Sequence, residues 1–213
     1  MSQPLIKICG LRDTGMIDTA ISAGATHVGL VFFARSPRNV SIEQAAALAD
    51  YARGRVSIVA LLVDPDMDMA AHVNAAVQPD VIQLHGGESP AQAGAIRAAT
   101  GREVWKAIGV RKTADLEAGR AYAGSVERLL YDAKPPEGAP LPGGTGLRID
   151  WGLMRGFAHP LRWVLAGGLD PRNVAEAMAI TGADAVDVSS GVERAPGVKD
   201  AALIAQFCAA ARG

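Results

Sequence analysis

Two side chains that can carry protons stand at the ends of short apolar runs far apart in the sequence. Cys9 ends the run 5–9, and Asp132 ends the run 128–132. A thiol acts as a base only in its thiolate form. A free aspartate is ionised near neutrality, so an acid role requires a partly apolar pocket that disfavours its charge. If both runs are strands of one barrel, the two groups can act on two sides of one substrate.

Short apolar runs alternate with alanine-rich segments of helical period along the whole chain. Continuous hydrophobicity indicates strands buried on both faces, as in parallel sheets. The predicted strands are residues 5–9, 27–32, 56–63, 81–85, 104–108, 128–132, 163–166 and 185–189. Eight βα units predict an α/β protein with a single (β/α)8 TIM barrel over residues 1–213. An open doubly wound sheet is the structural alternative, which periodicity alone does not separate from a barrel.

Helix-capping signals and one long loop lie between the predicted strands. Residues 41–44 (SIEQ) and 89–92 (SPAQ) predict capping boxes, and Asp170-Pro171 predicts another helix start. Residues 133–150 are rich in proline and glycine and follow the sixth predicted strand. In a barrel, a long loop at the carboxyl end of a strand is where lids and substrate contacts lie.

Bulk composition excludes several classes of function. The 213 residues are 49% hydrophobic and 20% charged, with a net charge of -1, which predicts no nucleic-acid or membrane partner. The start of the chain predicts no signal peptide, and two distant cysteines indicate a cytoplasmic location. The four histidines lack metal-ligand spacing and no nucleotide-binding motif occurs, so neither a metal nor a cofactor is expected. The pattern fits a monomer or a homodimer equally.

A set of motifs, in a fixed order from residue 7 to 200, resembles those of the phosphoribosylanthranilate isomerases of tryptophan biosynthesis. KICG alone is a weak signal, whereas DVSSGVE and the complete ordered set are specific. The motifs are KICG (7–10), SPRNVS (36–41), QLHG (83–86), LYD (130–132), GGTG (143–146) with DW (150–151), LAGGL (165–169) and VDVSSGVE (186–193).

The resemblance implies a reaction without a cofactor. It is an Amadori rearrangement of N-(5-phosphoribosyl)anthranilate to 1-(2-carboxyphenylamino)-1-deoxyribulose 5-phosphate. By the motif match, Asp132 is the general acid that opens the sugar ring and Cys9 is the general base. Lys7 shares the strand face of Cys9, so its ammonium is expected to favour the thiolate and to lie at the substrate site. A barrel-interior ion pair is the alternative for Lys7.

The resemblance also implies two anchors for a small phosphorylated substrate. Glycine-rich loops after the seventh and eighth strands, with the sixth loop, are expected to offer backbone N–H groups to the phosphate. These positions are Gly144, Gly146, Gly167, Gly168, Ser189, Ser190 and Gly191. Arg38 matches the arginine that binds the anthranilate carboxylate, with Arg35 as an alternative, and His85 is expected to hydrogen-bond within the mouth. Tight turns, a solvated arginine and a core histidine are the simpler alternatives.

One departure and two rival functions stand beside this interpretation. The loop that usually reads GGTGKTFDW is GGTGLRIDW here, which makes Arg148 the candidate to replace the lysine. An isomerase of histidine biosynthesis that acts on an imidazole ribotide has an aspartate at the position of Cys9, so Cys9 argues against it. A barrel that only binds a sugar phosphate need not keep Cys9, Asp132 and Arg38 together.

Overall fold

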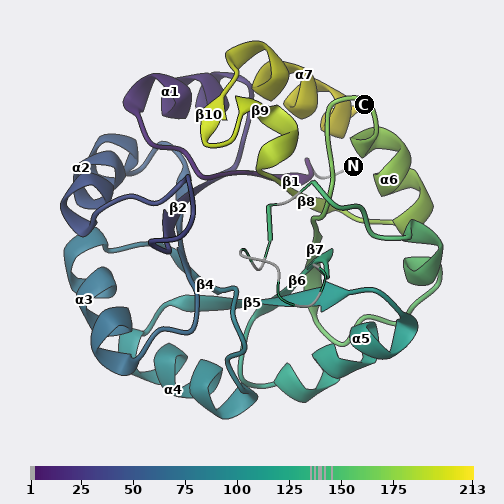
Figure 1. Ribbon diagram of the computed structural model, residues 1–213, viewed down its shortest axis with the longest axis horizontal. Coiled ribbons are helices and arrows are strands. Elements are labelled where there is room, and N and C mark those ends of the chain that lie inside the picture. The colour runs from purple at the N-terminus through teal and green to yellow at the C-terminus, as the bar shows by residue number, and fades with distance from the viewer. Residues whose placement is uncertain (1–2, 135, 137, 139–140, 142, 145) are drawn as a thin grey trace.

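Eight parallel strands close into a barrel in the part of the chain that the structure describes. The structure is a computed structural model and describes residues 3–134, 136, 138, 141, 143–144 and 146–213. Neighbouring strands pair in chain order, and β1 pairs with β8 to close the ring (Figure 1). The strands are β1 (Leu5–Cys9), β2 (His27–Phe32), β3 (Ser57–Leu62), β4 (Val81–Leu84), β5 (Glu103–Val110), β6 (Arg128–Ala133), β7 (Arg162–Leu165) and β8 (Ala185–Val188).

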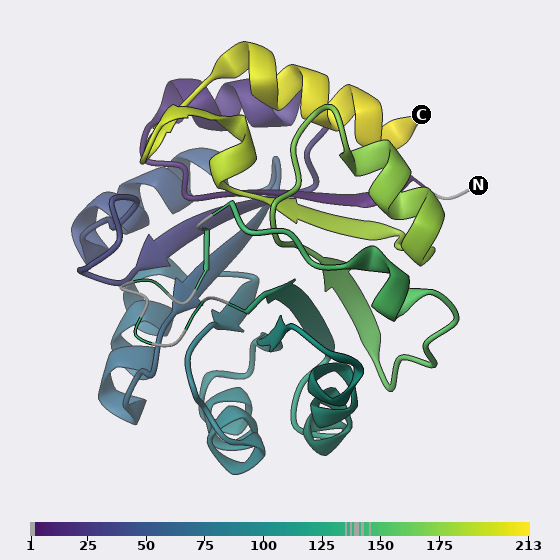
Figure 2. The same ribbon diagram turned by 45° about the vertical axis from the view of Figure 1, so that its right-hand side comes forward.

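Helices surround this barrel. Figure 1 shows them as an outer ring, and Figure 2 shows that the first and last helices lie side by side near the C-terminus. The α-helices are α1 (Thr14–Ser22), α2 (Ile42–Ala52), α3 (Met67–Val77), α4 (Pro90–Thr100), α5 (Thr113–Ala118), α6 (Val174–Thr181) and α7 (Ala201–Arg212). Short 3-10 helices are η1 (Gly119–Tyr122), η2 (Trp151–Met154) and η3 (Ser190–Val192), and a hairpin of β9 (Glu193–Ala195) and β10 (Val198–Lys199) precedes α7.

Strand alternation divides the core into two layers. On β6, Leu129 and Tyr131 pack between barrel and helices, whereas Leu130 packs inside the barrel. Trp105 fills the barrel interior beside Leu130. Because side chains of one strand alternate between the two layers, Cys9 and Asp132 face inward at the carboxyl ends of β1 and β6.

The predicted strands are confirmed, each within two residues of its observed bounds. The Ser89–Gln92 capping box is confirmed in both directions. At Ser41, the hydroxyl accepts from Gln44 N, but the Gln44 side chain donates to Arg12 O instead of closing the box. The helix predicted to start at Asp170 begins at Val174, because Asn173 is its N-cap and the intervening residues form a turn.

The sixth βα unit departs from the predicted repeat. Between β6 and β7 the described residues form only η2, whereas each of the other units carries an α-helix. Described residues of the preceding loop lie at the mouth of the barrel: a Cβ atom added to Gly144 would lie 2.8 Å from Arg38 Nη1, and one added to Gly168 would lie 2.7 Å from Leu147 O. The described residues Gly144 and Leu147 of this proline- and glycine-rich stretch therefore pack against Arg38 and Gly168 at the barrel mouth.

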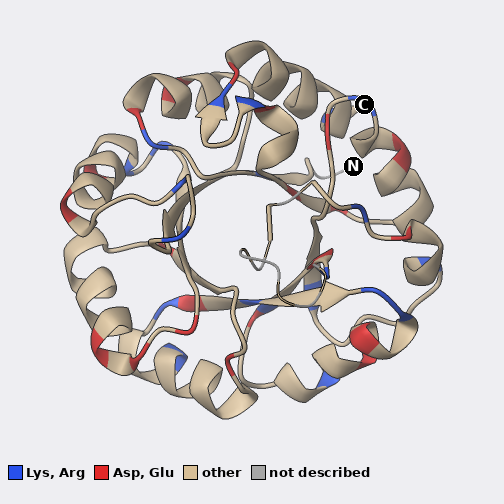
Figure 3. Ribbon diagram, in the orientation of Figure 1, with Lys and Arg blue, Asp and Glu red and all other residues tan. Residues whose placement is uncertain are grey.

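Charged residues of both signs are interspersed around the outer ring (Figure 3). Within the described residues, no helix is long and apolar enough to span a bilayer.

Candidate active site

One pocket at the carboxyl ends of the strands gathers most of the predicted site residues. Cys9 enters it from β1, His85 from the end of β4 and Asp132 from β6. The predicted binding residues that also line it are Arg38, Gly144, Gly146, Gly167, Gly168, Ser189 and Ser190. A second hollow shares His85, Asp132, Phe33, Val63 and Leu141 with it, so the two are compartments of one mouth. Thr145 of the GGTG motif lies outside the described residues.

Cys9 lies above a buried ion pair. The Lys7 ammonium donates to Asp187 Oδ1 at 2.8 Å, and the Lys7 side chain is fully buried. Burial raises the pKa of the Cys9 thiol, and the Asp187 carboxylate raises it further, whereas the Lys7 ammonium opposes both. An added Cβ atom at Gly29 would lie 2.9 Å from Cys9 Sγ, so the glycine on β2 makes room for the thiol.

Lys7 does not line the pocket, which corrects its inclusion in the predicted substrate site. Its ammonium is held inside the barrel by Asp187, the alternative that the sequence left open. The expected influence of Lys7 on Cys9 remains, since it lowers the pKa of the thiol. Burial is nevertheless the larger effect, so the resting thiol is held in its protonated form more firmly than a free cysteine.

Asp132 is held by His85 at the mouth. His85 Nε2 lies 3.2 Å from Asp132 Oδ2, and His85 Nδ1 lies 2.9 Å from the amide nitrogen of Gln83. The other carboxylate oxygen, Oδ1, accepts from Ala133 N at 2.8 Å. Gly143 passes directly over this pair, because an added Cβ atom would overlap both Asp132 Oδ2 and His85 Nε2. His85 is therefore a polar partner within the mouth and not a core histidine.

Small residues from the loops after β6, β7 and β8 form one wall of the pocket. Gly167 and Gly168 have φ angles of +81° and +66°, a backbone region that favours glycine. Ser189 and Ser190, after β8, line the same pocket. Gly191 does not line the pocket: an added Cβ atom would overlap Leu169 O, so its glycine serves packing of η3 against the β7 loop. Its predicted contact with the phosphate stays a prediction.

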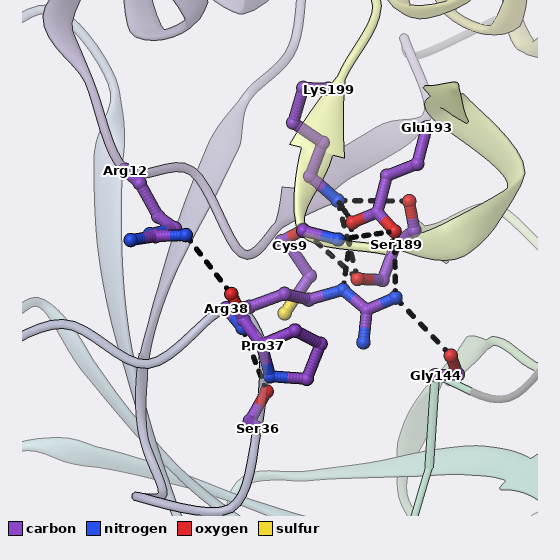
Figure 4. A network of polar contacts seen from close by, with 10 residues as sticks. Cys9, Arg12, Ser36, Pro37, Arg38, Gly144, Ser189, Glu193 and Lys199 are labelled. Atoms are coloured by element: carbon purple, nitrogen blue, oxygen red, sulfur yellow. Dashed lines mark hydrogen bonds and ion pairs between the residues drawn. The ribbon is translucent and has the colours of Figure 1, made fainter. Parts of the chain in front are cut away.

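Arg38 reaches the pocket from the loop after β2 and is bound from behind by Glu193. The Arg38 Nε donates to Glu193 Oε1 at 2.7 Å and Nη2 donates to Oε2 at 2.8 Å. Nη2 also donates to Gly144 O at 3.3 Å, which ties the guanidinium to the loop over the mouth (Figure 4). Among the described residues, no group of three or more His, Cys, Asp or Glu is arranged to hold a metal ion.

A family model described as N-(5'phosphoribosyl)anthranilate (PRA) isomerase matches residues 6–210. The chain belongs to the N-(5'-phosphoribosyl)anthranilate isomerase family. It is 51% identical over 208 residues to the N-(5'-phosphoribosyl)anthranilate isomerase of Paramagnetospirillum magneticum, covering 98% of this chain and 97% of that protein. Membership of this family makes the chain an isomerase of tryptophan biosynthesis with a TIM-barrel fold.

Solved structures of the N-(5'-phosphoribosyl)anthranilate isomerase family share this architecture. The phosphoribosyl anthranilate isomerase of Thermotoga maritima superposes with a TM-score of 0.88 at 34% identity, covering 99% of this chain and 100% of that one. A phosphoribosyl anthranilate isomerase in complex with reduced 1-(o-carboxyphenylamino)-1-deoxyribulose 5-phosphate superposes with a TM-score of 0.86 at 32% identity, with the same coverage. The barrel and its mouth are thus common to proteins of this isomerase family.

The loop that departs from the isomerase family pattern is built differently from the expectation for Arg148. Its guanidinium lies over the ring of Trp151, 5.2 Å from the centroid, and it does not line the pocket. Ile149 and Trp151 are buried against the core and anchor the end of the loop. Arg148 therefore packs on the anchor of the loop in this structure, and its replacement of the lysine stays a prediction.

Three polar residues near the site escaped prediction from the sequence. Gln83 is fully buried behind His85, and Glu193 and Lys199 are paired beside Arg38. Gln83 and Glu193 stand inside the QLHG and VDVSSGVE motifs, so the motifs themselves marked them. Lys199 lies in a two-residue strand of a hairpin that no periodic pattern indicates.

Proposed function

We propose that this chain converts N-(5-phosphoribosyl)anthranilate to 1-(2-carboxyphenylamino)-1-deoxyribulose 5-phosphate, with Cys9 as general base and Asp132 as general acid. The observation that carries the proposal is that both groups line one pocket from different strands, β1 and β6. A substrate bound between them presents its ring oxygen to one group and its C2' carbon to the other. Family membership supports the choice of substrate.

The reaction proceeds in two proton transfers. Asp132 gives a proton to the furanose ring oxygen, the C1'–oxygen bond breaks, and the nitrogen lone pair forms a protonated Schiff base at C1'. The Cys9 thiolate then removes the C2' proton, and the electron pair moves through C1' to the nitrogen to give an enolamine. Tautomerisation gives the ketose, with no net oxidation or reduction. Positioned acids and bases of this kind contribute rate factors of about 10² to 10⁴ each.

Two anchors hold the substrate ends. The backbone of Gly146, Gly167 and Gly168, with Ser189 and Ser190, offers small residues and N–H groups that suit a phosphate. Arg38 lines the pocket and carries the cation that suits the anthranilate carboxylate. The sugar then spans the pocket between these anchors, where Cys9 and Asp132 lie.

Turnover of freshly generated phosphoribosylanthranilate, followed by the loss of anthranilate-type fluorescence, tests this proposal. Wild type, Cys9→Ser and Asp132→Asn are compared with matched controls. Cys208→Ser alters a buried cysteine packed on the core by α7, and Asp184→Asn alters an exposed aspartate before β8. We expect kcat to collapse in the first two variants and to stay at the wild-type value in the controls.

Each other outcome has a defined meaning. Activity retained by a folded Cys9→Ser variant would keep the reaction and remove Cys9 as its base. A folded wild type without turnover would overturn the proposed reaction. The aminoaldose imidazole ribotide of the histidine pathway would then be the next substrate, because its isomerisation is also an Amadori rearrangement. Thermal denaturation of every variant shows which of them is folded.

A further inference from the structure

A buried network of charges surrounds the side of Arg38 that faces away from the pocket. Glu193 accepts from Arg38 with both carboxylate oxygens, at 2.7 and 2.8 Å. Lys199 donates to the same Oε1 atom at 2.7 Å, so one carboxylate bridges two cations. The side chains of Glu193 and Lys199 are each only 3% exposed. Neither residue lines the pocket.

This network fixes the plane of the Arg38 guanidinium. A guanidinium is planar, so a two-point bond through Nε and Nη2 determines where the third nitrogen, Nη1, is placed. Within the described residues Nη1 has no hydrogen-bond partner, and Figure 4 shows it directed away from Glu193. Gly144 lies next to it, since an added Cβ atom would lie 2.8 Å from Nη1. The absence of a side chain at Gly144 therefore leaves Nη1 accessible.

The network also keeps a positive charge at the pocket. With Lys199 protonated, Arg38 and Lys199 carry one positive charge each and Glu193 one negative charge, which leaves a net charge of +1. Burial lowers the pKa of Lys199, and the Glu193 carboxylate opposes this by holding the ammonium form. Burial alone would raise the pKa of Glu193, but the bonds from Arg38 and Lys199 lower it, so the carboxylate stays ionised. A carboxylate ligand thus meets an arginine that is oriented by Glu193 but not neutralised, because Lys199 balances Glu193.

The β9–β10 hairpin holds the network in place. Gly197 N, at the turn, donates to Glu193 Oε2 at 3.1 Å. The same glycine has a φ angle of +76°, and an added Cβ atom would lie 2.6 Å from Pro37 O. Lys199 Nζ donates to Ser189 O at 2.9 Å, which links the hairpin to the end of β8. The hairpin therefore packs directly on the loop that carries Arg38.

From these contacts we propose that Glu193 is a positioning residue that orients Arg38 toward the carboxylate of the substrate, with Lys199 balancing its charge. Glu193 touches no substrate and acts only through Arg38. This inference rests on the proposed function, because it assigns Glu193 a part in recognising the anthranilate carboxylate. It gives the β9–β10 hairpin a role in substrate specificity.

The test compares two substrates in wild type and Glu193→Gln. One is phosphoribosylanthranilate and the other is its aniline analogue, N-(5-phosphoribosyl)aniline, which lacks the carboxylate. For phosphoribosylanthranilate we expect KM to rise about ten-fold with kcat little changed, as for one lost charged hydrogen bond to the ground state. For the aniline analogue we expect KM of the variant to equal that of wild type within a factor of about two.

A merely structural role would give a different result. Equal losses on both substrates, or an unchanged KM for phosphoribosylanthranilate, would overturn the inference. In an Arg38→Met background the Glu193→Gln substitution should have no further effect on KM, since its action passes through Arg38. Glu127→Gln is the control, because Glu127 also pairs with an arginine, Arg97, but lies at the amino end of β6.

A second variant covers a failure to fold, and the wild-type result separates this inference from the proposed function. If Glu193→Gln does not fold, Glu193→Asp keeps the charge and shortens the side chain, and the same comparison of two substrates applies to it. A wild type that turns over phosphoribosylanthranilate together with a variant of unchanged KM overturns this inference and leaves the proposed function standing. A wild type without turnover overturns the proposed function, and the role of Glu193 falls with it.

Discussion

The side chain of Arg38 lies across the backbone of Gly10, so closely that a Cβ atom added to Gly10 would lie 2.6 Å from Arg38 Cδ. Gly10 also has a φ angle of +82°, in the region that favours glycine. Two motifs that are distant in sequence, KICG and SPRNVS, therefore meet in space. Arg38, the proposed carboxylate anchor, therefore reaches the pocket across the glycine that follows the proposed base.

Gly10→Ala should accordingly raise KM as well as reduce stability. The positive φ angle alone costs about 1 to 3 kcal/mol of unfolding free energy for a residue with a side chain. Displacement of Arg38 adds a loss of affinity for phosphoribosylanthranilate. Gly54→Ala is the matched control, because Gly54 has a φ angle of +74° and no atom within 4 Å of an added Cβ. Steady-state kinetics and thermal denaturation of both variants check this, and an equal KM in the two would contradict it.

His85→Asn should lower kcat with little change in KM, because His85 contacts Asp132 and the change leaves Arg38 in place. The expected loss is smaller than the factor of about 10² to 10⁴ that a general acid itself supplies. Gln83→Leu should act in the same direction more weakly, since Gln83 Nε2 lies 2.9 Å from His85 Nδ1 and Gln83 Oε1 has no partner in the described residues. His72→Asn, on the exposed face of α3, is the control.

A different kinetic result would show that His85 does not act through Asp132. If His85→Asn raised KM and left kcat unchanged, the ring would be a binding group and not the partner of the acid. A pH profile of kcat adds a second measurement, because loss of the His85 contact changes the environment of Asp132 in the enzyme–substrate complex.

Lys7 and Asp187 should move the alkaline dependence of activity in opposite directions. Burial raises the pKa of the Cys9 thiol, so the thiolate fraction, and with it kcat/KM, should still be rising with pH above the ordinary range of a cysteine. The Lys7 ammonium lowers this pKa and Asp187 raises it. Lys7→Met should therefore shift the rising limb to higher pH, and Asp187→Asn should shift it to lower pH.

The pH dependence of kcat/KM in the three proteins measures these shifts directly. Each single variant leaves one buried charge without its partner and loses stability, so the double variant Lys7→Met/Asp187→Asn serves as the folded reference. Its limb should lie at a pH set by burial, which raises the pKa of the thiol, and by the remaining Lys199 ammonium, which lowers it. Shifts in the same direction for both single variants would show that loss of packing, and not charge, controls the thiol.

Most of the fold could be predicted from the sequence, because strands of a parallel barrel are buried on both faces and appear as continuous apolar runs. Runs such as residues 27–32 are apolar throughout, and the observed β2 has the predicted bounds. The sixth unit could not be predicted as well, since η2 is held by the burial of Ile149 and Trp151 and not by helical periodicity. The predicted start of α6 at Asp170 was wrong. Asp170 accepts a hydrogen bond from Arg172 N within a turn, and this bond competes with helix capping.

The candidate site also has a part that could be predicted from the sequence and a part that could not. The carboxyl ends of strands identify Cys9 and Asp132, because a parallel barrel brings these positions to one mouth. An ion pair between distant segments leaves no pattern in the local sequence. Neither the Lys7–Asp187 pair nor the Arg38–Glu193 pair could therefore be derived from residue spacing, and the residues of the second pair are 155 positions apart. The packing of Gly191 against Leu169 could not be predicted either, since a glycine that serves packing looks the same in sequence as one that approaches a ligand.

Stability should depend on pH through His159, which lies in the connection before β7. Its ring stacks on Trp163, with centroids 4.1 Å apart, and both ring nitrogens are buried without a hydrogen-bond partner in the described residues. Burial lowers the pKa of His159 from 6.5 to about 4. The unfolded chain therefore takes up a proton before the folded protein does as the pH falls, and the free energy of unfolding decreases between about pH 6.5 and pH 4.

His159→Phe should remove this part of the pH dependence, worth up to about 3 kcal/mol at pH 4. A phenyl ring keeps the stacking on Trp163 and has no nitrogen to protonate, so the variant should also gain stability at pH 5 relative to wild type. His27, whose pKa burial likewise lowers to about 4, leaves a residual slope in both proteins. Urea denaturation at pH 7, 6, 5 and 4 measures the difference, and an identical slope in wild type and variant would mean that the ring of His159 is protonated as readily in the folded protein as in the unfolded chain.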